Sequence, residues 1–87
     1  MKVKEGFVLR TVGEKILVVP VGNMVSSFNG MLVLNKAGKF LWDNLQKDIE
    51  LEDLVKTLMD TYSVSESVAE NDVKDFIKKL QSVGIIE

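Results

Sequence analysis

Carboxylates are the side chains of this chain best suited to chemistry, and most of them lie in its C-terminal half. Glu66, Glu70 and Asp72 fall within about two helical turns of one another. Clustered carboxylates can hold a hard cation such as Ca²⁺. However, the loop pattern of a calcium-binding EF-hand is absent, and a carboxylate cluster on a helix is far more often a solvated face. We therefore predict no metal site.

The residue types that this chain lacks exclude most kinds of catalytic site. The chain has no histidine and no cysteine, so it lacks an imidazole base, a Cys–His pair and the usual ligands of a zinc finger. Its 6 glycines form neither a GxGxxG nor a GxxxxGK[ST] phosphate-binding motif. We expect a protein that is not an enzyme, holds no cofactor and acts by binding.

Length and composition predict one domain spanning residues 1–87. The chain is 46% hydrophobic, and no run approaches the roughly 20 apolar residues that span a bilayer. The lack of cysteine gives no reason to expect secretion. We expect a cytoplasmic protein with no membrane contact.

The net charge of −2 hides an uneven distribution along the chain. Residues 1–42 carry 6 basic and 2 acidic side chains, whereas residues 43–87 carry 5 lysines and 11 carboxylates. An acidic chain is a poor candidate for binding nucleic acid. If the two halves of the chain face each other across a site, a ligand there should meet opposite charges on its two sides.

The first third of the chain has the pattern of a β-hairpin. Two runs rich in β-branched residues, 7–12 and 15–20, flank Gly13 and its neighbour, which suit a two-residue type II′ turn. That turn places Leu9 opposite Val18. Apolar residues concentrate on one face of the pair, which indicates a sheet covered on one side only.

A change of period after the hairpin predicts three helices. A short third strand over 30–34 is followed by amphipathic helices over 36–46, 51–62 and 66–83. Gly38 inside the first helix suggests a close packing contact, because glycine there costs about 1 kcal/mol relative to alanine. Three strands followed by three helices make an α+β domain with a small antiparallel sheet.

Two kinds of binding fit this architecture. The helices over 51–62 and 66–83 could form a helix-turn-helix, as in a winged-helix nucleic-acid-binding protein. The second of these helices carries 4 carboxylates against 3 lysines, which repel a phosphate backbone. Nucleic-acid binding therefore remains only the alternative.

Peptide capture is the favoured kind of binding. A short third strand at the edge of the sheet leaves N–H and C=O groups that an extended peptide can pair with, and the third helix can supply an apolar floor. The same edge could instead pair with a second copy of the chain and form a homodimer. Because proline has no N–H, Leu32→Pro should remove a donor from that edge.

Two segments of the chain resemble the PqqD family. One contains Leu34-Asn35-x-x-Gly38-x-x-x-Trp42, and the other reads Asp72-Val73-x-x-Phe76-Ile77-x-x-Leu80-x-x-x-Gly84-Ile85. The resemblance extends from Gly6 to Ile86. It implies a winged-helix-like fold of three antiparallel strands followed by three helices.

The resemblance also implies a function, that of a peptide chaperone or RiPP recognition element. Such proteins hold the leader segment of a ribosomally synthesised precursor peptide and present it to a modifying enzyme, often a radical SAM protein. The resemblance does not separate the pyrroloquinoline quinone (PQQ) pathway from other peptide modifications.

The site residues follow from the same resemblance. In the family the leader peptide adds to the third strand and lies against the third helix. Because the third helix is acidic, we expect basic residues in the part of the leader that faces it, and modest weakening of binding by salt. The residues implied to bind the peptide are Gly30, Met31, Leu32, Val33, Leu34, Val68, Ala69, Asp72, Val73 and Phe76.

Overall fold

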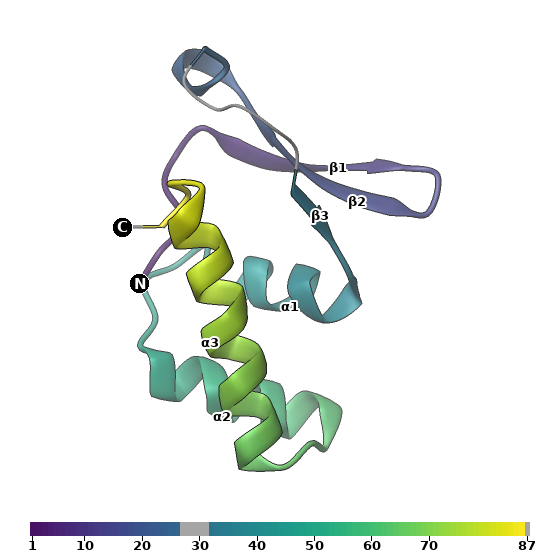
Figure 1. The fold of residues 1–87 in the computed structure, drawn as a ribbon, viewed down its shortest axis with the longest axis vertical. Helices are drawn as coiled ribbons and strands as arrows, with labels where there is room; N and C mark the ends of the chain where they lie inside the picture. The colour runs from purple at the N-terminus through teal and green to yellow at the C-terminus, as the bar shows by residue number, and fades with distance from the viewer. Residues whose placement is uncertain (27–31, 87) are drawn as a thin grey trace.

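A computed structural model describes residues 1–26 and 32–86, so the predicted site residues Gly30 and Met31 lie outside the described residues. It contains a three-stranded antiparallel sheet followed by three helices, which confirms the predicted α+β architecture (Figure 1). The elements are β1 (Phe7–Val12), β2 (Lys15–Pro20), a short 3-10 turn (Gly22–Met24), β3 (Leu32–Leu34), α1 (Lys36–Asn44), α2 (Leu51–Tyr62) and α3 (Glu66–Ser82).

The predicted hairpin and its register are confirmed. β1 and β2 pair antiparallel with Leu9 opposite Val18, and Val12 opposite Lys15 closes the turn. Gly13 has φ +62, the positive value that the first central position of a type II′ turn requires.

The sheet has the order β1-β2-β3, and one of its faces packs on the helices. The inner face buries Phe7, Val18 and Leu34 among its residues, each at most 6% exposed. On the outer face Val12 and Val33 are 60% and 50% exposed. The prediction of a sheet covered on one side is therefore confirmed.

α1 begins where the sequence indicates but ends earlier. The Asn35 side chain accepts a hydrogen bond from the Gly38 N–H at 2.7 Å and caps the helix. The helix stops at Asn44 instead of continuing to residue 46. The Leu45 carbonyl accepts a hydrogen bond from the Val3 N–H at 2.9 Å, so the chain leaves the helix where the N-terminal segment crosses it.

α2 and α3 follow the predicted bounds closely, and α3 has clear signals at both ends. The Ser65 hydroxyl accepts a hydrogen bond from the Val68 N–H at its start. At its end Gly84 has φ +79, and the Ile85 N–H bonds to the Leu80 carbonyl at 2.9 Å. This is a Schellman motif, which turns Ile85 back into the core.

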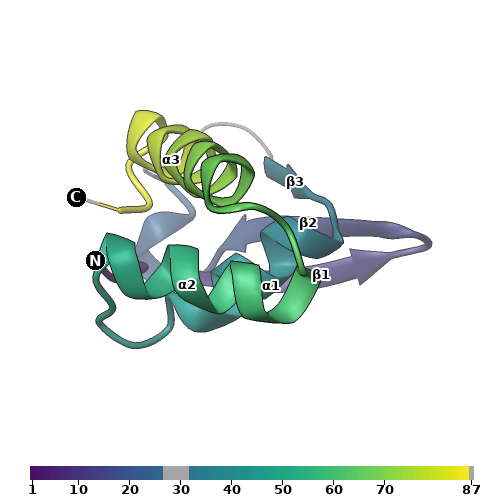
Figure 2. The same cartoon turned by 90° about the horizontal axis from the view of Figure 1, so that it is seen from below.

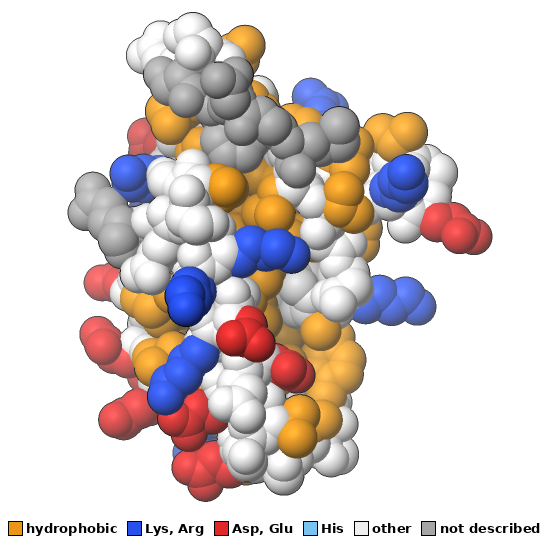
Figure 3. All heavy atoms as spheres, in the orientation of Figure 1, with side chains coloured by type: hydrophobic (Ala, Val, Ile, Leu, Met, Phe, Trp, Pro, Cys, Tyr) orange, Lys and Arg blue, Asp and Glu red, His pale blue; other side chains and the backbone are white. Residues whose placement is uncertain are grey.

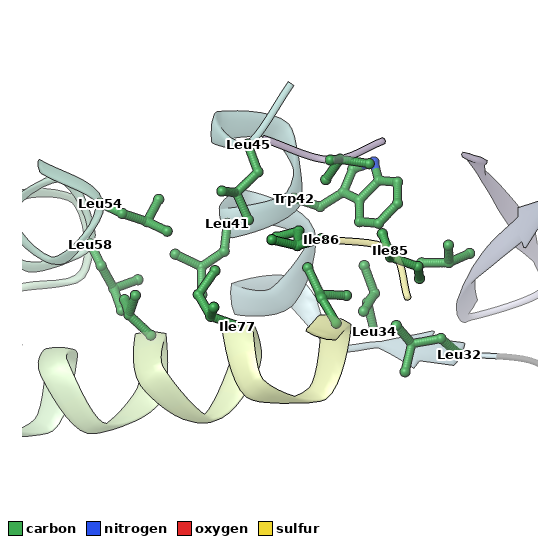
Figure 4. Packing of buried hydrophobic residues seen from close by; sticks show 14 of the residues in the cluster. Leu32, Leu34, Leu41, Trp42, Leu45, Leu54, Leu58, Ile77, Ile85 and Ile86 are labelled. Atoms are coloured by element: carbon green, nitrogen blue, oxygen red, sulfur yellow. The ribbon is translucent and has the colours of Figure 1, made fainter. Parts of the chain in front are cut away.

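The core lies between the inner face of the sheet and the three helices (Figure 4). Leu45, Leu54, Leu80 and Ile85 have no exposed surface. The two ends of the chain lie on the same side of the molecule (Figure 1).

Candidate functional site

A cleft of about 350 Å³ opens between β3 and α3. Figure 2 shows these two elements side by side, with α1 and α2 beneath them. Apolar side chains are exposed in the hollow beside α3, and acidic and basic side chains lie along it (Figure 3). The lining residues are Val33, Leu34, Asn35, Ala37, Gly38, Leu41, Leu58, Asp72, Asp75, Phe76 and Lys79.

Gly38 lets α1 approach the other two walls of the cleft. A Cβ atom at this position would lie 3.4 Å from the Leu34 Cβ and 3.4 Å from the Phe76 Cε1. The predicted packing contact at Gly38 is therefore present, and it joins residues from β3, α1 and α3. Because Leu34 and Phe76 also line the cleft, the missing side chain keeps its floor open.

One face of α3 forms the charged wall of the cleft. Asp72, Asp75, Phe76 and Lys79 are three or four residues apart, so they project from the same side of the helix. The three charged side chains are exposed. Among the described residues none of the three forms an ion pair, whereas Glu70 and Lys74 on the same helix pair at 2.6 Å.

The expectation of opposite charges on the two sides of the site is wrong. The β3 and α1 wall contributes no charged side chain to the described lining of the cleft, although α1 contains lysines. The Lys39 ammonium instead pairs with Asp43 at 2.9 Å on the exposed surface of α1. In the described lining of the cleft, both signs of charge come from α3.

The direction of the backbone groups on β2 follows from the turn. In a two-residue hairpin the residues that flank the turn form a hydrogen-bonded pair, and such pairs alternate with non-hydrogen-bonded ones. Val12 and Lys15 flank the turn here. Alternation then directs the N–H and C=O groups of Ile16 and Val18 away from β1 and toward β3.

Val33 is consequently the residue of β3 with outward-facing backbone groups. Leu32 and Leu34 lie opposite Val18 and Ile16, so their N–H and C=O groups bond to β2. Val33 lies between them and directs its N–H and C=O to the other edge of β3. In the part of the chain that the structure describes, no strand pairs with that edge.

This alternation corrects the expected effect of Leu32→Pro. The N–H of Leu32 faces β2, so a proline there would break the native sheet and leave the open edge unchanged. The donor on the open edge belongs to Val33.

Four of the predicted site residues line the cleft, namely Val33, Leu34, Asp72 and Phe76. Leu32 is only 8% exposed and lies on the inner face of the sheet. The structure therefore brings together predicted residues from both β3 and α3.

The other predicted residues of α3 lie outside the cleft lining. Val68 is 47% exposed and lies one helical turn before Asp72 on the same face of α3. Ala69 and Val73 are fully buried. A bound ligand could touch these two only if core side chains moved, and they support the cleft from beneath.

Several lining residues were not predicted. Asp75 and Lys79 could have been found from their spacing to Asp72 and Phe76, which places all four on one helix face. No comparable signal in the sequence indicates Leu58, because its place in the cleft depends on how α2 packs beneath α3.

The described residues contain neither a candidate metal site nor a helix that could span a membrane. Across residues 1–26 and 32–86, no group of three or more histidine, cysteine or acidic side chains could hold a metal ion. No helix within these ranges is long and apolar enough to cross a membrane.

Comparison with known proteins shows the family of this chain and a solved structure that shares its fold. No curated protein matches its sequence. Among solved structures, it is similar to TbiB1 in complex with the TbiA(beta) leader peptide, with 21% identity, a TM-score of 0.78 and coverage of 100% of this chain and 95% of that one. This likeness confirms the fold. The model of the family described as coenzyme PQQ synthesis protein D matches residues 14–86, so the chain belongs to the PqqD family.

Proposed function

We propose that this protein binds the leader segment of a ribosomally synthesised precursor peptide and presents it to a modifying enzyme, without catalysing a reaction itself. The observation that carries the proposal is the open edge of β3 beside an apolar cleft. Membership of the PqqD family supports it, and so does the similarity to a protein whose structure contains a leader peptide.

The open edge and the cleft fit one extended peptide. Its backbone would pair with the N–H and C=O of Val33, as an added fourth strand. Because side chains alternate along a strand, every second peptide side chain would point into the cleft, over Leu34 and Phe76. A volume of about 350 Å³ is within the range of small-molecule sites, so the cleft can hold a few side chains.

The modifying enzyme would engage a different surface. The outer face of the hairpin exposes Val8 and Val12 beside Arg10 and Lys15, and it stays accessible when a peptide lies in the cleft. Holding the leader here would raise the effective concentration of the precursor at the enzyme. We propose a radical SAM protein in the cytoplasm as this partner, in PQQ synthesis or another peptide modification.

Titration of the isotope-labelled protein with each short peptide encoded next to its gene tests the proposal. We expect amide shifts over residues 32–35 and 72–79, with little change in α2 residues that lie away from the cleft. Phe76→Ala should weaken binding about tenfold, because it removes the largest apolar side chain of the described cleft lining. Val83→Ala is the control, since Val83 is 40% exposed at the end of α3 and outside the cleft lining.

Three other outcomes would contradict the proposal. Shifts confined to the hairpin turn would place the peptide elsewhere. Salt-dependent binding of duplex DNA without peptide binding would support the winged-helix alternative. If the free protein associates with itself through β3 and saturating peptide does not disrupt this association, β3 is instead the edge through which a homodimer forms.

A further inference from the structure

We propose that α3 selects the order of charges along the bound peptide. Asp72 and Asp75 would accept a basic side chain, and Lys79 would accept an acidic side chain placed downstream of it. This inference rests on the proposed function, since it assumes that an extended peptide occupies the cleft.

The three charged groups are available to a ligand. Asp72, Asp75 and Lys79 line the cleft and are exposed, and within the described residues none of them is in an ion pair. Two other pairs of charged side chains on the helices already compensate each other, Lys39 with Asp43 and Lys74 with Glu70. A peptide charge would therefore meet an uncompensated partner in the cleft, beside a low-dielectric apolar floor.

The direction of the peptide fixes which charge comes first. β3 runs down toward α1 in Figure 1, whereas α3 runs upward beside it. Both strand pairs of the sheet are antiparallel, and antiparallel pairing is slightly more stable per residue. A peptide added antiparallel to β3 would run in the same direction as α3. Its upstream part would then face Asp72 and Asp75, and its downstream part would face Lys79.

The spacing of the two peptide charges follows from the rise per residue of the helix and of the added strand. At about 1.5 Å per helical residue, Lys79 lies about 6 Å beyond Asp75 and about 10.5 Å beyond Asp72 along the helix. A strand advances about 3.4 Å per residue, so these distances correspond to about two or three strand residues. Because both charges must face α3, their separation is even, and the even values on either side of three are two and four. We expect Lys or Arg two or four positions before Asp or Glu.

Selection from a phage-displayed library of random peptides about 12 residues long, enough for one strand, tests this order. The full chain is used as bait, and Val33→Pro identifies the peptides that need the β3 edge. Wild-type protein should enrich a basic residue two or four positions before an acidic one. With Lys79→Glu, the downstream preference should change from acidic to basic, and a peptide selected on the wild type should bind about tenfold more weakly.

Lys78→Glu is the matched control for this variant. It makes the same change in net charge on the same exposed helix, but Lys78 does not line the cleft. We expect it to leave the selected pattern unchanged and to alter affinity by about twofold or less, because its field is screened by solvent.

Two results would overturn the inference, and they separate it from the proposed function. The first result is a set of peptides that need the β3 edge but show no order of charges, or show the same order with Lys79→Glu. It would refute charge selection and leave the proposed leader binding in place. If no enriched peptide depends on the β3 edge, both the inference and the proposed function are wrong.

Discussion

At the scale of single residues, helix propensity and tertiary packing favour different residues at position 38. Alanine would favour the helix by about 1 kcal/mol. However, its Cβ would lie 3.2 Å from the Asn35 Oδ1 that caps α1, and 3.4 Å from the ring of Phe76. We expect Gly38→Ala to change the free energy of unfolding by no more than about 1 kcal/mol, since the gain in propensity opposes the crowding.

Peptide affinity should respond to Gly38→Ala more than stability does. Gly38 itself lines the cleft, so the added methyl group would fill part of the cleft floor beside Leu34 and Phe76, and we expect peptide to bind several-fold more weakly. Urea unfolding and calorimetric titration of the same variant measure the two effects. Unchanged affinity would mean that the bound peptide does not reach the floor at Gly38.

Asp48 provides a test of pH dependence. Its carboxylate accepts a hydrogen bond from the N-terminal ammonium at 2.7 Å, and this bond with the positive charge lowers the pKa of Asp48 below its usual value. A carboxylate whose pKa is lower in the folded state stabilises the fold above the pKa of the unfolded chain, and loses that effect as pH falls through the folded pKa.

We therefore expect Asp48→Asn to lower the melting temperature slightly at neutral pH, because the side chain is exposed. The difference from the wild type should shrink below about pH 4 and vanish when both states are protonated. Thermal unfolding at several pH values measures this. A difference that persists at pH 2 or so would mean that the carboxylate acts through something other than its charge.

The residues predicted best from the sequence are those whose role is local. Gly13 was identified at the hairpin turn because a two-residue turn depends on its own residues. Asp75 and Lys79 were missed because the resemblance implied only Val68, Asp72 and Phe76 on this face of the helix. The cleft is lined by this face of α3, and only the packing of β3 reveals that it has a ligand-sized space.

At the scale of elements, the open edge of β3 makes a sharp prediction. Val33→Pro removes the outward N–H and leaves the bonds of Leu32 and Leu34 to β2 intact. Proline is tolerated at such an edge position, so the protein should still fold. We expect peptide binding to weaken about tenfold, through the lost hydrogen bond and the bulk of the ring at the docking edge.

Val33→Ala is the matched control, because it keeps the N–H and removes most of a half-exposed side chain. We expect it to weaken binding only about twofold, a small fraction of the proline effect. Equal losses in the two variants would assign the effect to the side chain, and β3 would not be the docking strand.

Strand pairing was predictable within the hairpin and less so beyond it. The Gly13 turn fixes the register of β1 and β2, because the two strands are adjacent in sequence. The pairing of β3 with β2 crosses a longer connection, for which the sequence offers no register signal. The sequence alone therefore does not show which residue of β3 directs its N–H to the open edge. The prediction named Leu32, whereas the alternation along the strand assigns this donor to Val33.

At the scale of the whole molecule, the N-terminal segment joins parts of the chain that are far apart in sequence. The Val3 N–H bonds to the Leu45 carbonyl, the Lys4 N–H to the Ile85 carbonyl, and the Met1 carbonyl accepts from the Ile49 N–H, each at 2.9 Å. These contacts could not be predicted, because residues 1–6 have no periodic pattern and their partners lie in irregular segments.

Val3 is the apolar anchor of this junction, and its truncation tests how far the junction stabilises the fold. Val3 is only 6% exposed, so Val3→Ala removes two buried methyl groups and leaves a small cavity. We expect a loss of about 2 kcal/mol in the free energy of unfolding, or about 10 °C in melting temperature. Val12→Ala makes the same chemical change at a site that is 60% exposed, and should cost far less.

Measuring the peptide affinity of Val3→Ala tests whether the junction only stabilises the fold or also shapes the cleft. Met1–Lys4 contact the end of α1 and the residues after α3, whereas the cleft is lined by the start of α1 and the middle of α3. Well below its melting temperature, Val3→Ala should therefore bind peptide with wild-type affinity. An affinity that falls while the protein remains folded would show that the junction sets the distance between β3 and α3.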